Sequence, residues 1–541
     1  MSPMASRPAS GSGLPPPTVP SPPTSIPWLG LLAVLMGAFI ATLTGRLSTY
    51  GLADIRGALS AGFDEGAWIT TAQTAAQMLI TVPAVWMGAA YGPRRVLMGA
   101  SIAFAVISLL TPYSPTLPAL LTMQFLGGLA SGCFIPLALG FIMRNTPPRY
   151  WPVGIAVYAM NLELSLNISA SLEGWYVEHH SWRWIFWQTV PLALIMSLCL
   201  WRGIKDEPRT QRPPADAFGM LAGGGGLALI YAGLDQGNRL DWLGSGLVWG
   251  LIVAGALLFT ASFIHEARTA SPLVNLKVIF RAPMASQLLL IGFLRLTIVA
   301  TAYLITLYLG VVRGYRDLEV GDTLIWIAAP QILFCPLAAL MLGRSDPRLV
   351  ASIGFIFVGV SCLLVAHNLT PLWGSYQFLP SSLLQALGQS FAMSGVIFLG
   401  ILHMKPQYAL TFGALLQTAR LMGGEIGSAF VATMARVREQ VASNLIGQHV
   451  QVGNPDVIQR VKQYGAMTTK VVDPVSALAR GELVLGDVVR AAATTQAVID
   501  VFVVIAVFTA VALLVVVFRR RPPEGPASAP PLFPVPNANL P

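Results

Sequence analysis

The feature that most constrains this chain is a series of long apolar runs along most of its length. A helix that crosses a bilayer needs about 20 mostly apolar residues, and fourteen runs of about that length lie between polar or Pro/Gly breaks. Only 11% of the 541 residues are charged, against roughly a quarter in soluble domains. Lipid must therefore solvate most of the chain, and the sequence predicts an all-α polytopic membrane protein.

The positions of these runs predict the domain organisation. The runs cover residues 28–49, 69–90, 96–112, 117–142, 152–174, 184–201, 217–235, 245–264, 284–309, 321–342, 349–366, 376–401, 409–434 and 497–518. We expect a disordered tail at 1–27, a six-helix bundle at 28–201, a linker with two extra helices at 202–264, a second six-helix bundle at 265–518, and a disordered tail at 519–541. The second bundle includes an outer loop at 436–496, expected to be partly helical and solvent-facing.

The distribution of basic residues predicts the orientation. With the N-terminus inside, the inner segments hold 18 Lys and Arg residues, whereas the short outer loops hold 5. Because cytoplasmic loops carry the excess of Lys and Arg, both termini are expected in the cytoplasm. The same loops account for the net charge of +9, and no base-reading motif indicates a nucleic-acid partner.

An internal repeat at an offset of eight spans is typical of transporters built from two related halves. The second span contains Pro83 and leads into the loop Gly92-Pro93-Arg94-Arg95, and the tenth contains Pro336 and leads into Pro347-Arg348. We take Gly92, Arg94 and Arg95 as a candidate inner-gate loop.

Charged residues inside the spans show the same offset of eight spans more clearly. Spans one and nine carry Arg46 and Arg295, and spans five and thirteen carry glutamates and one further arginine: Glu163, Glu173, Arg420 and Glu425. A charge at bilayer depth costs about 2.5 to 3.5 kcal/mol on insertion scales. These six groups should therefore face a cavity or one another, and they mark a candidate pathway.

Two roles can be assigned to these charges as hypotheses. Arg46 and Glu173 both lie in the outer quarter of their spans, so they are expected to form an ion pair that either closes an outer gate or only holds the bundle together. A carboxyl in apolar surroundings can bind and release a proton near neutral pH. Glu163 is the preferred carrier, because it lies deepest and has no basic residue near it in sequence; the alternative is a neutral acid bonded to a neighbouring helix.

Polar side chains in other spans are candidates for a substrate cavity. Gln124 is the strongly polar residue of the fourth span, and Gln385 and Gln389 lie at i and i+4 on one face of the twelfth. With Arg295 they fit an apolar cavity that contains a few polar contacts. Arginines along the path favour anionic or neutral cargo over lipophilic cations.

Other chemistries find little support in the sequence. The glycine run 223–226 has no following Lys-Ser/Thr, so it is not a phosphate-binding loop. His179 and His180 are adjacent and lack the spacing of a helical metal site. The four cysteines lie in apolar runs, and no nucleophile–base pair is visible. We expect no cofactor, no metal and no enzymatic activity.

Several segments resemble the fourteen-helix drug:proton antiporters of the major facilitator superfamily, the EmrB/QacA type. The matching segments are Trp68-Ile-Thr-Thr-Ala, Gly128 to Leu137, Gly174-Trp175, Ser181-Trp-Arg-Trp-Ile-Phe186, Val190-Pro191 and Arg420 to Gly427. The resemblance implies two six-helix bundles joined by two extra helices, a small-molecule substrate and alternating access in a bacterial inner membrane. The long last outer loop resembles that of the branch that works with a periplasmic adaptor and an outer-membrane channel.

The sequence departs from this family where proton coupling usually resides. Thr44 stands where the family has an acid in helix 1, Gln124 replaces the helix 4 arginine, and residues 169–174 replace the helix 5 Gly-Pro motif and its kink. Either coupling has moved to the unusual charges, or the cargo differs, or coupling is lost. The leading hypothesis is proton-driven export of amphipathic or organic-anion compounds. The alternatives are a specific metabolite or siderophore exporter and a non-transporting membrane sensor or partner.

Overall fold

The computed structural model describes residues 27–204, 215–269, 282–403, 409–451, 453–467 and 474–520, and within them regular structure is entirely helical. The first part comprises α1 Trp28–Tyr50, α2 Leu52–Ala58, α3 Phe63–Gly66, α4 Trp68–Tyr91, α5 Pro93–Leu110, α6 Leu117–Ser131, α7 Phe134–Asn145, α8 Trp151–Asn167, α9 Ser169–His179, α10 Trp184–Trp187 and α11 Thr189–Gly203. The second comprises α12 Ala217–Gly237, α13 Gly246–Arg268, α15 Ala282–Arg313, α16 Asp317–Leu342, α17 Pro347–Asn368, α18 Leu379–Leu402, α19 Ala409–Gly447, α20 Pro455–Ala466 and α21 Pro474–Val517.

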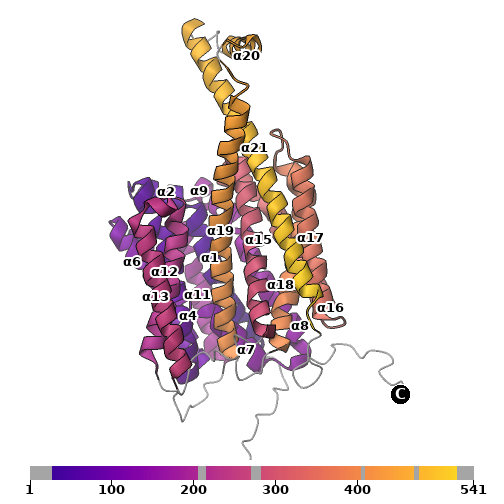
Figure 1. Ribbon diagram of the computed structural model, residues 1–541. Coiled ribbons are helices and arrows are strands. Elements are labelled where there is room, and N and C mark those ends of the chain that lie inside the picture. Colours follow the sequence, from indigo (N-terminus) through magenta and orange to yellow (C-terminus); the bar gives the residue numbers. More distant parts are fainter. Residues whose placement is uncertain are drawn as a thin grey trace, which may run out of the picture.

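The long helices stand side by side and run in alternating directions (Figure 1). By length and composition, eleven helices of the described residues could cross a membrane, or twelve if a bent pair is one span. The polytopic helical fold is thereby confirmed. The expected spans at 69–90 and 409–434 are helices α4 and α19, which are not among those candidates, so the number fourteen stays a prediction. The expected tails, apart from Pro27, Arg519 and Arg520, lie outside the described residues.

The fifth predicted span is bent, although the family's kink motif is absent. The segments Pro148–Asn167 and Ser169–His179 meet at 43°. Around the break, Asn167 Nδ2 donates to the Glu163 carbonyl at 2.9 Å, and Ser169 Oγ donates to the Leu166 carbonyl at 2.6 Å. Such side-chain bonds compete with the helical backbone ladder. The expectation of an unkinked helix was therefore wrong, because hydrogen-bonding side chains stand where the Gly-Pro motif would be.

The region expected as an outer loop at 436–496 is mainly helical. Helix α19 continues to Gly447, α20 follows, and α21 begins at Pro474 rather than near residue 497. Together they rise above the other helices as a projection (Figure 1). Helix α20 packs on α21 through glycines, since a Cβ at Gly481 would lie 2.3 Å from the Val461 carbonyl oxygen. We call this end of the bundle the projection end, and the opposite end, which carries Arg94 and Arg519, the basic end.

The first and second parts touch at both ends of the bundle. At the projection end, a Cβ at Gly174 would lie 2.6 Å from the Leu318 Cα, so α9 and α16 are in close backbone contact. At the basic end, a Cβ at Gly413 would lie 2.3 Å from the Pro136 carbonyl oxygen, which brings α19 against α7. The two parts are therefore in close backbone contact towards both ends of the bundle.

Helix α12 packs against α4, α13 and α19. Towards α4, Gln236 Nε2 donates to Thr71 Oγ1 at 2.6 Å. Towards α19, Asn238, just beyond α12, donates to the Ala429 carbonyl at 3.0 Å and accepts from Thr433 Oγ1 at 2.6 Å. The helix is thus bonded to elements of both parts.

Candidate functional site

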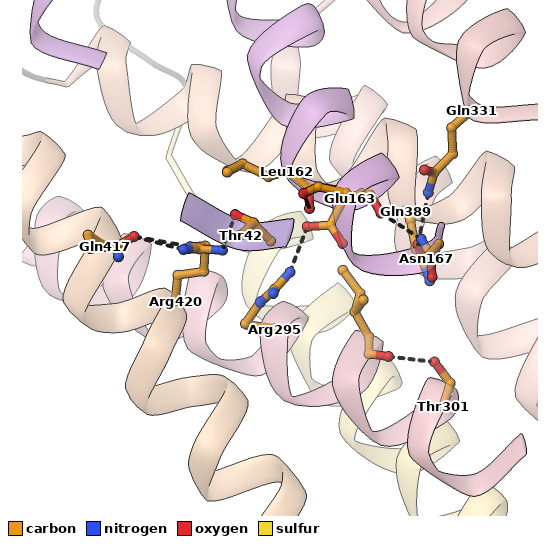
Figure 2. Close-up of polar contacts among 12 residues, drawn as sticks. Thr42, Leu162, Glu163, Asn167, Arg295, Thr301, Gln331, Gln389, Gln417 and Arg420 are labelled. Carbon is orange, nitrogen blue, oxygen red and sulfur yellow. Dashed lines mark hydrogen bonds and ion pairs between the residues drawn. The ribbon is translucent and has the colours of Figure 1, made fainter. Parts of the chain in front are cut away.

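A buried ion pair lies between α8 and α15. Arg295 Nη1 is 3.0 Å from Glu163 Oε1, and the two side chains are 5% and 0% exposed (Figure 2). The second carboxylate oxygen, Oε2, is buried and has no hydrogen-bond partner among the described residues. Sequence reasoning noted that no basic residue lies near Glu163 in sequence, and its partner Arg295 is 132 positions away. This separation explains why the pairing was missed.

A second buried guanidinium lies beside this pair. Arg420 on α19 is fully buried, and its Nε and Nη2 donate to Gln417 Oε1 at 3.2 and 2.9 Å. Its Nη1 donates to Thr42 Oγ1 on α1 at 3.3 Å, as Figure 2 shows. Arg46, one turn beyond Thr42, is half-buried and acts electrostatically on Arg295 and Arg420. Two buried arginines therefore lie near the Glu163 carboxylate, and Arg46 lies near both of them.

A polar chain continues from Glu163 toward α16 and α18. Asn167 Nδ2 donates to Gln389 Oε1 at 3.0 Å, and Gln331 Nε2 donates to the same oxygen at 2.9 Å. Gln389 Nε2 donates to Gln385 Oε1 at 3.4 Å, and Gln385 Nε2 in turn lies 3.8 Å from the Cys362 sulfur. The two glutamines selected from the sequence thus belong to one buried network with Asn167 and Gln331.

The network retains unused hydrogen-bonding capacity. Several of its buried polar atoms have no partner among the described residues: Tyr158 Oη, Glu163 Oε2, Asn167 Oδ1, Gln331 Oε1 and Gln417 Nε2. Native proteins bond nearly all such groups. Atoms of this kind, gathered around two buried guanidiniums, can bind a partly polar molecule.

The other candidates lie away from this centre. Glu425 packs near Tyr231 of α12 and accepts from Ser428 Oγ at 3.3 Å. Gln124 donates to Ser48 at 3.3 Å on the other side of α1. Gly92 ends α4 with φ +91°, a conformation that favours glycine, and Arg94 donates to the Trp201 carbonyl at 2.8 Å at the basic end. Arg95 follows in the first turn of α5.

The expected ion pair between Arg46 and Glu173 is not formed. Glu173 is 1% exposed, and both of its carboxylate oxygens are buried with no hydrogen-bond partner in the part of the chain that the structure describes. The charged groups that act on it are Asp317 and Asp54, both acids. The shared depth of Arg46 and Glu173 could not predict the ion pair, because depth does not fix the rotation of either helix.

Sequence reasoning also missed several residues that form hydrogen bonds in the buried network or beside it. Thr42, Asn167, Gln331 and Gln417 complete the central network, and Asp235 on α12 accepts a hydrogen bond from Thr71. Asn167, Gln331 and Gln417 could have been predicted, because each is an amide side chain inside an apolar run. Thr42 gave no such signal, because threonine in a membrane helix often bonds only its own backbone.

The residues of the network come from α1, α8, α15, α16, α18 and α19, which are far apart in sequence. A helical membrane bundle with a charged, partly unsatisfied centre and glycine contacts at both ends has the architecture of a secondary transporter. The family model described as Major Facilitator Superfamily matches residues 34–428. The chain belongs to this superfamily.

Similar proteins place it near the multidrug exporters, as the resemblance in sequence predicted. The multidrug export protein EmrB of Haemophilus influenzae is 23% identical over 443 residues, covering 81% of this chain and 87% of that protein. The fatty acid resistance protein FarB of Neisseria gonorrhoeae is 22% identical, covering 77% and 83%. The tetracenomycin C resistance and export protein of Streptomyces glaucescens is 24% identical, covering 76% of each.

Solved structures support the fold. The human organic anion transporter MFSD10 (TETRAN) superposes with a TM-score of 0.54 at 14% identity, covering 91% of this chain and 98% of that one. The proton:xylose symporter XylE gives a TM-score of 0.54 at 10% identity, covering 88% and 99%. At these identities the likeness concerns the architecture alone.

Proposed function

We propose that this protein exports amphipathic or organic-anion compounds in exchange for protons, by alternating access between two six-helix bundles, 28–201 and 265–518. The observation that carries the proposal is the buried centre formed by Glu163, Arg295 and Arg420 between α8, α15 and α19. Relatives of similar length are named as multidrug export and antibiotic export proteins. A non-transporting sensor is not favoured by those names.

The charge balance of the centre supports an anionic cargo. Among the described residues, the buried Arg295 and Arg420 have only Glu163 as a counter-charge, and Arg46 adds to the positive field. Guanidinium groups bind carboxylates and phosphates through paired hydrogen bonds. An anionic cargo would compete with Glu163 for Arg295 and with Gln417 for Arg420. The relative named for fatty acid resistance is consistent with this class of cargo.

The test is cargo-dependent proton flux in liposomes that contain the purified chain and an internal pH dye. With an imposed proton gradient, impermeant organic anions should produce flux, whereas lipophilic cations should produce much less. Glu163→Gln and Glu173→Gln should each lower the flux, because they remove the candidate proton carriers. Glu178→Gln, on an exposed position of α9, is the matched control. Flux with cations alone would refute the cargo class, and absence of flux with every cargo would refute the exporter.

The membrane orientation follows from the positions of the basic residues. We propose a bacterial inner membrane, with the basic end and both termini in the cytoplasm and the projection in the periplasm. This orientation is supported by four arginines at the basic end: Arg94, Arg144, Arg344 and Arg519.

The projection supports the proposal of a periplasmic adaptor that passes cargo to an outer-membrane channel. Leu483, Val484 and Val488 on α21 are 70%, 38% and 44% exposed at the level of α20. Apolar side chains in such a position are typical of an interaction surface. Leu483→Asp with Val488→Asp should lower drug resistance in cells at least several-fold while liposome flux stays unchanged. Glu482→Gln is the neighbouring control; unchanged resistance in the double variant would contradict the adaptor role.

A further inference from the structure

Three acidic side chains converge at the projection end from three separate elements. Glu173 belongs to α9, Asp54 to α2 and Asp317 to the first turn of α16. Both aspartates are half-buried, and both act electrostatically on Glu173. The cluster joins elements of the first part of the chain to an element of the second.

The burial of Glu173 sets it apart from an ordinary acidic surface. Its side chain is 1% exposed, and within the described ranges neither carboxylate oxygen has a hydrogen-bond partner. Gly51 makes room for it, since a Cβ there would lie 3.1 Å from Glu173 Oε1. An isolated buried carboxylate is so costly that the group takes up a proton instead. The packing seen here therefore requires a neutral Glu173.

The charged and titratable groups around Glu173 offer no neutralising partner. Helix α16 contributes Asp317, and α1 contributes Tyr50 and Arg46, of which Arg46 forms no ion pair with Glu173 among the described residues. Tyr50 lies near Thr306 of α15. Helix α10 contributes no charged group, and the acid of α8, Glu163, is ten positions earlier and bound to Arg295. Ionised Glu173 would thus meet mainly negative charge.

The acids lie where α9 and α16 are in closest contact. Ser171 Oγ donates to the Gly321 carbonyl at 2.9 Å, and a Cβ at Gly321 would lie 2.6 Å from the Ser171 Cα. Asp317 stands at the N-terminus of α16, where the helix dipole stabilises its negative charge. A second negative charge on Glu173 would repel Asp317 across this contact and favour separation of the helices.

We propose that Glu173, Asp317 and Asp54 form a proton-binding site, and that α9 and α16 stay packed at the projection end only while Glu173 holds its proton. The role of this site in transport rests on the proposed proton-coupled export. The binding of the proton and the closure of the contact are independent of any cargo.

The test measures the separation of α9 and α16 as a function of pH, in the full chain in lipid nanodiscs without cargo. Spin labels at Glu178→Cys and Ile325→Cys report on the contact, and the four native cysteines are buried. Between about pH 5 and about pH 9, the wild-type distance should change from a short to a longer population. Glu173→Gln should keep the short distance throughout, because glutamine stays neutral.

Two further variants separate proton binding from simple packing. Asp317→Asn removes a negative charge that favours the protonated form of Glu173, so the proton should be released, and the transition should occur, at lower pH by on the order of one unit. Asp322→Asn, an exposed acid on the same helix, should titrate like the wild type. The Asp317→Asn shift keeps the proposal testable if Glu173→Gln fails to fold.

Failure of the proton-binding proposal and failure of the proposed export give different experimental results. A wild-type distance that does not depend on pH, or a Glu173→Gln variant that titrates like the wild type, overturns this proposal even when cargo-dependent flux is present. Absence of flux with every cargo, together with a pH-dependent distance lost in Glu173→Gln, overturns the exporter but supports the proton site.

Discussion

Replacing Arg295 with methionine is expected to abolish cargo-dependent flux and to destabilise the protein. The change leaves Glu163 buried without its counter-charge, and breaking a buried ion pair costs about 3 to 5 kcal/mol. Thermal unfolding of the purified variant in detergent measures the loss of stability, and the liposome assay measures the loss of transport.

The double variant Glu163→Gln with Arg295→Met separates the two effects. Because neither partner of the Glu163–Arg295 pair then remains charged, part of the lost stability should return, while flux stays absent. Arg239→Met is the control, since its partner Asp64 is 78% exposed and such a pair contributes about 1 kcal/mol at most. Flux recovered in the double variant would mean that the ion pair only supports the fold.

Replacing Arg420 with lysine is expected to weaken the recognition of anionic cargo while charge is retained. Arg420 places three nitrogens on Gln417 and Thr42, and one ammonium group cannot reproduce that planar arrangement. Loss of one charged hydrogen bond, about 1.5 kcal/mol or more, corresponds to a KM for organic anions roughly ten times higher. Flux measured against cargo concentration gives KM and the maximal rate separately.

The control for this prediction lies on the same helix. Arg436→Lys changes an exposed arginine of α19, and its kinetics should match those of the wild type. Cargo without a negative charge should show a much smaller change in KM with Arg420→Lys. An equal loss for neutral and anionic cargo would indicate that Arg420 only holds α19 against α1.

The helical membrane fold could be predicted from the sequence because apolar length is a local property. A run such as 28–49 must be helical in lipid, where the backbone has no other hydrogen-bond partner, and α1 covers the same residues. The internal repeat also drew attention to Arg295 and Glu163, which the structure brings into contact. Both inferences used only spacing within the chain.

The partners of each charge could not be predicted, because they depend on helix rotation and on distant parts of the chain. Thr42 and Arg420 are 378 positions apart, and Asn167 and Gln389 are 222 apart. Glu173 was assigned to Arg46 on depth alone, but it lies near Asp317 at a contact set by Gly174 and Gly321. The bend after Asn167 was also missed, since it arises from side-chain hydrogen bonds rather than from proline.

The bonds of α12 have a consequence for how far the bundle can open. Thr71 of α4 and Thr433 of α19 are tied, through Gln236 and Asn238, to one short stretch of chain at the projection end. Any motion that draws α4 away from α19 there must break one of these ties or carry α12 along with one side. Helix α12 thus limits how far α4 and α19 can separate at the projection end while both hydrogen bonds hold.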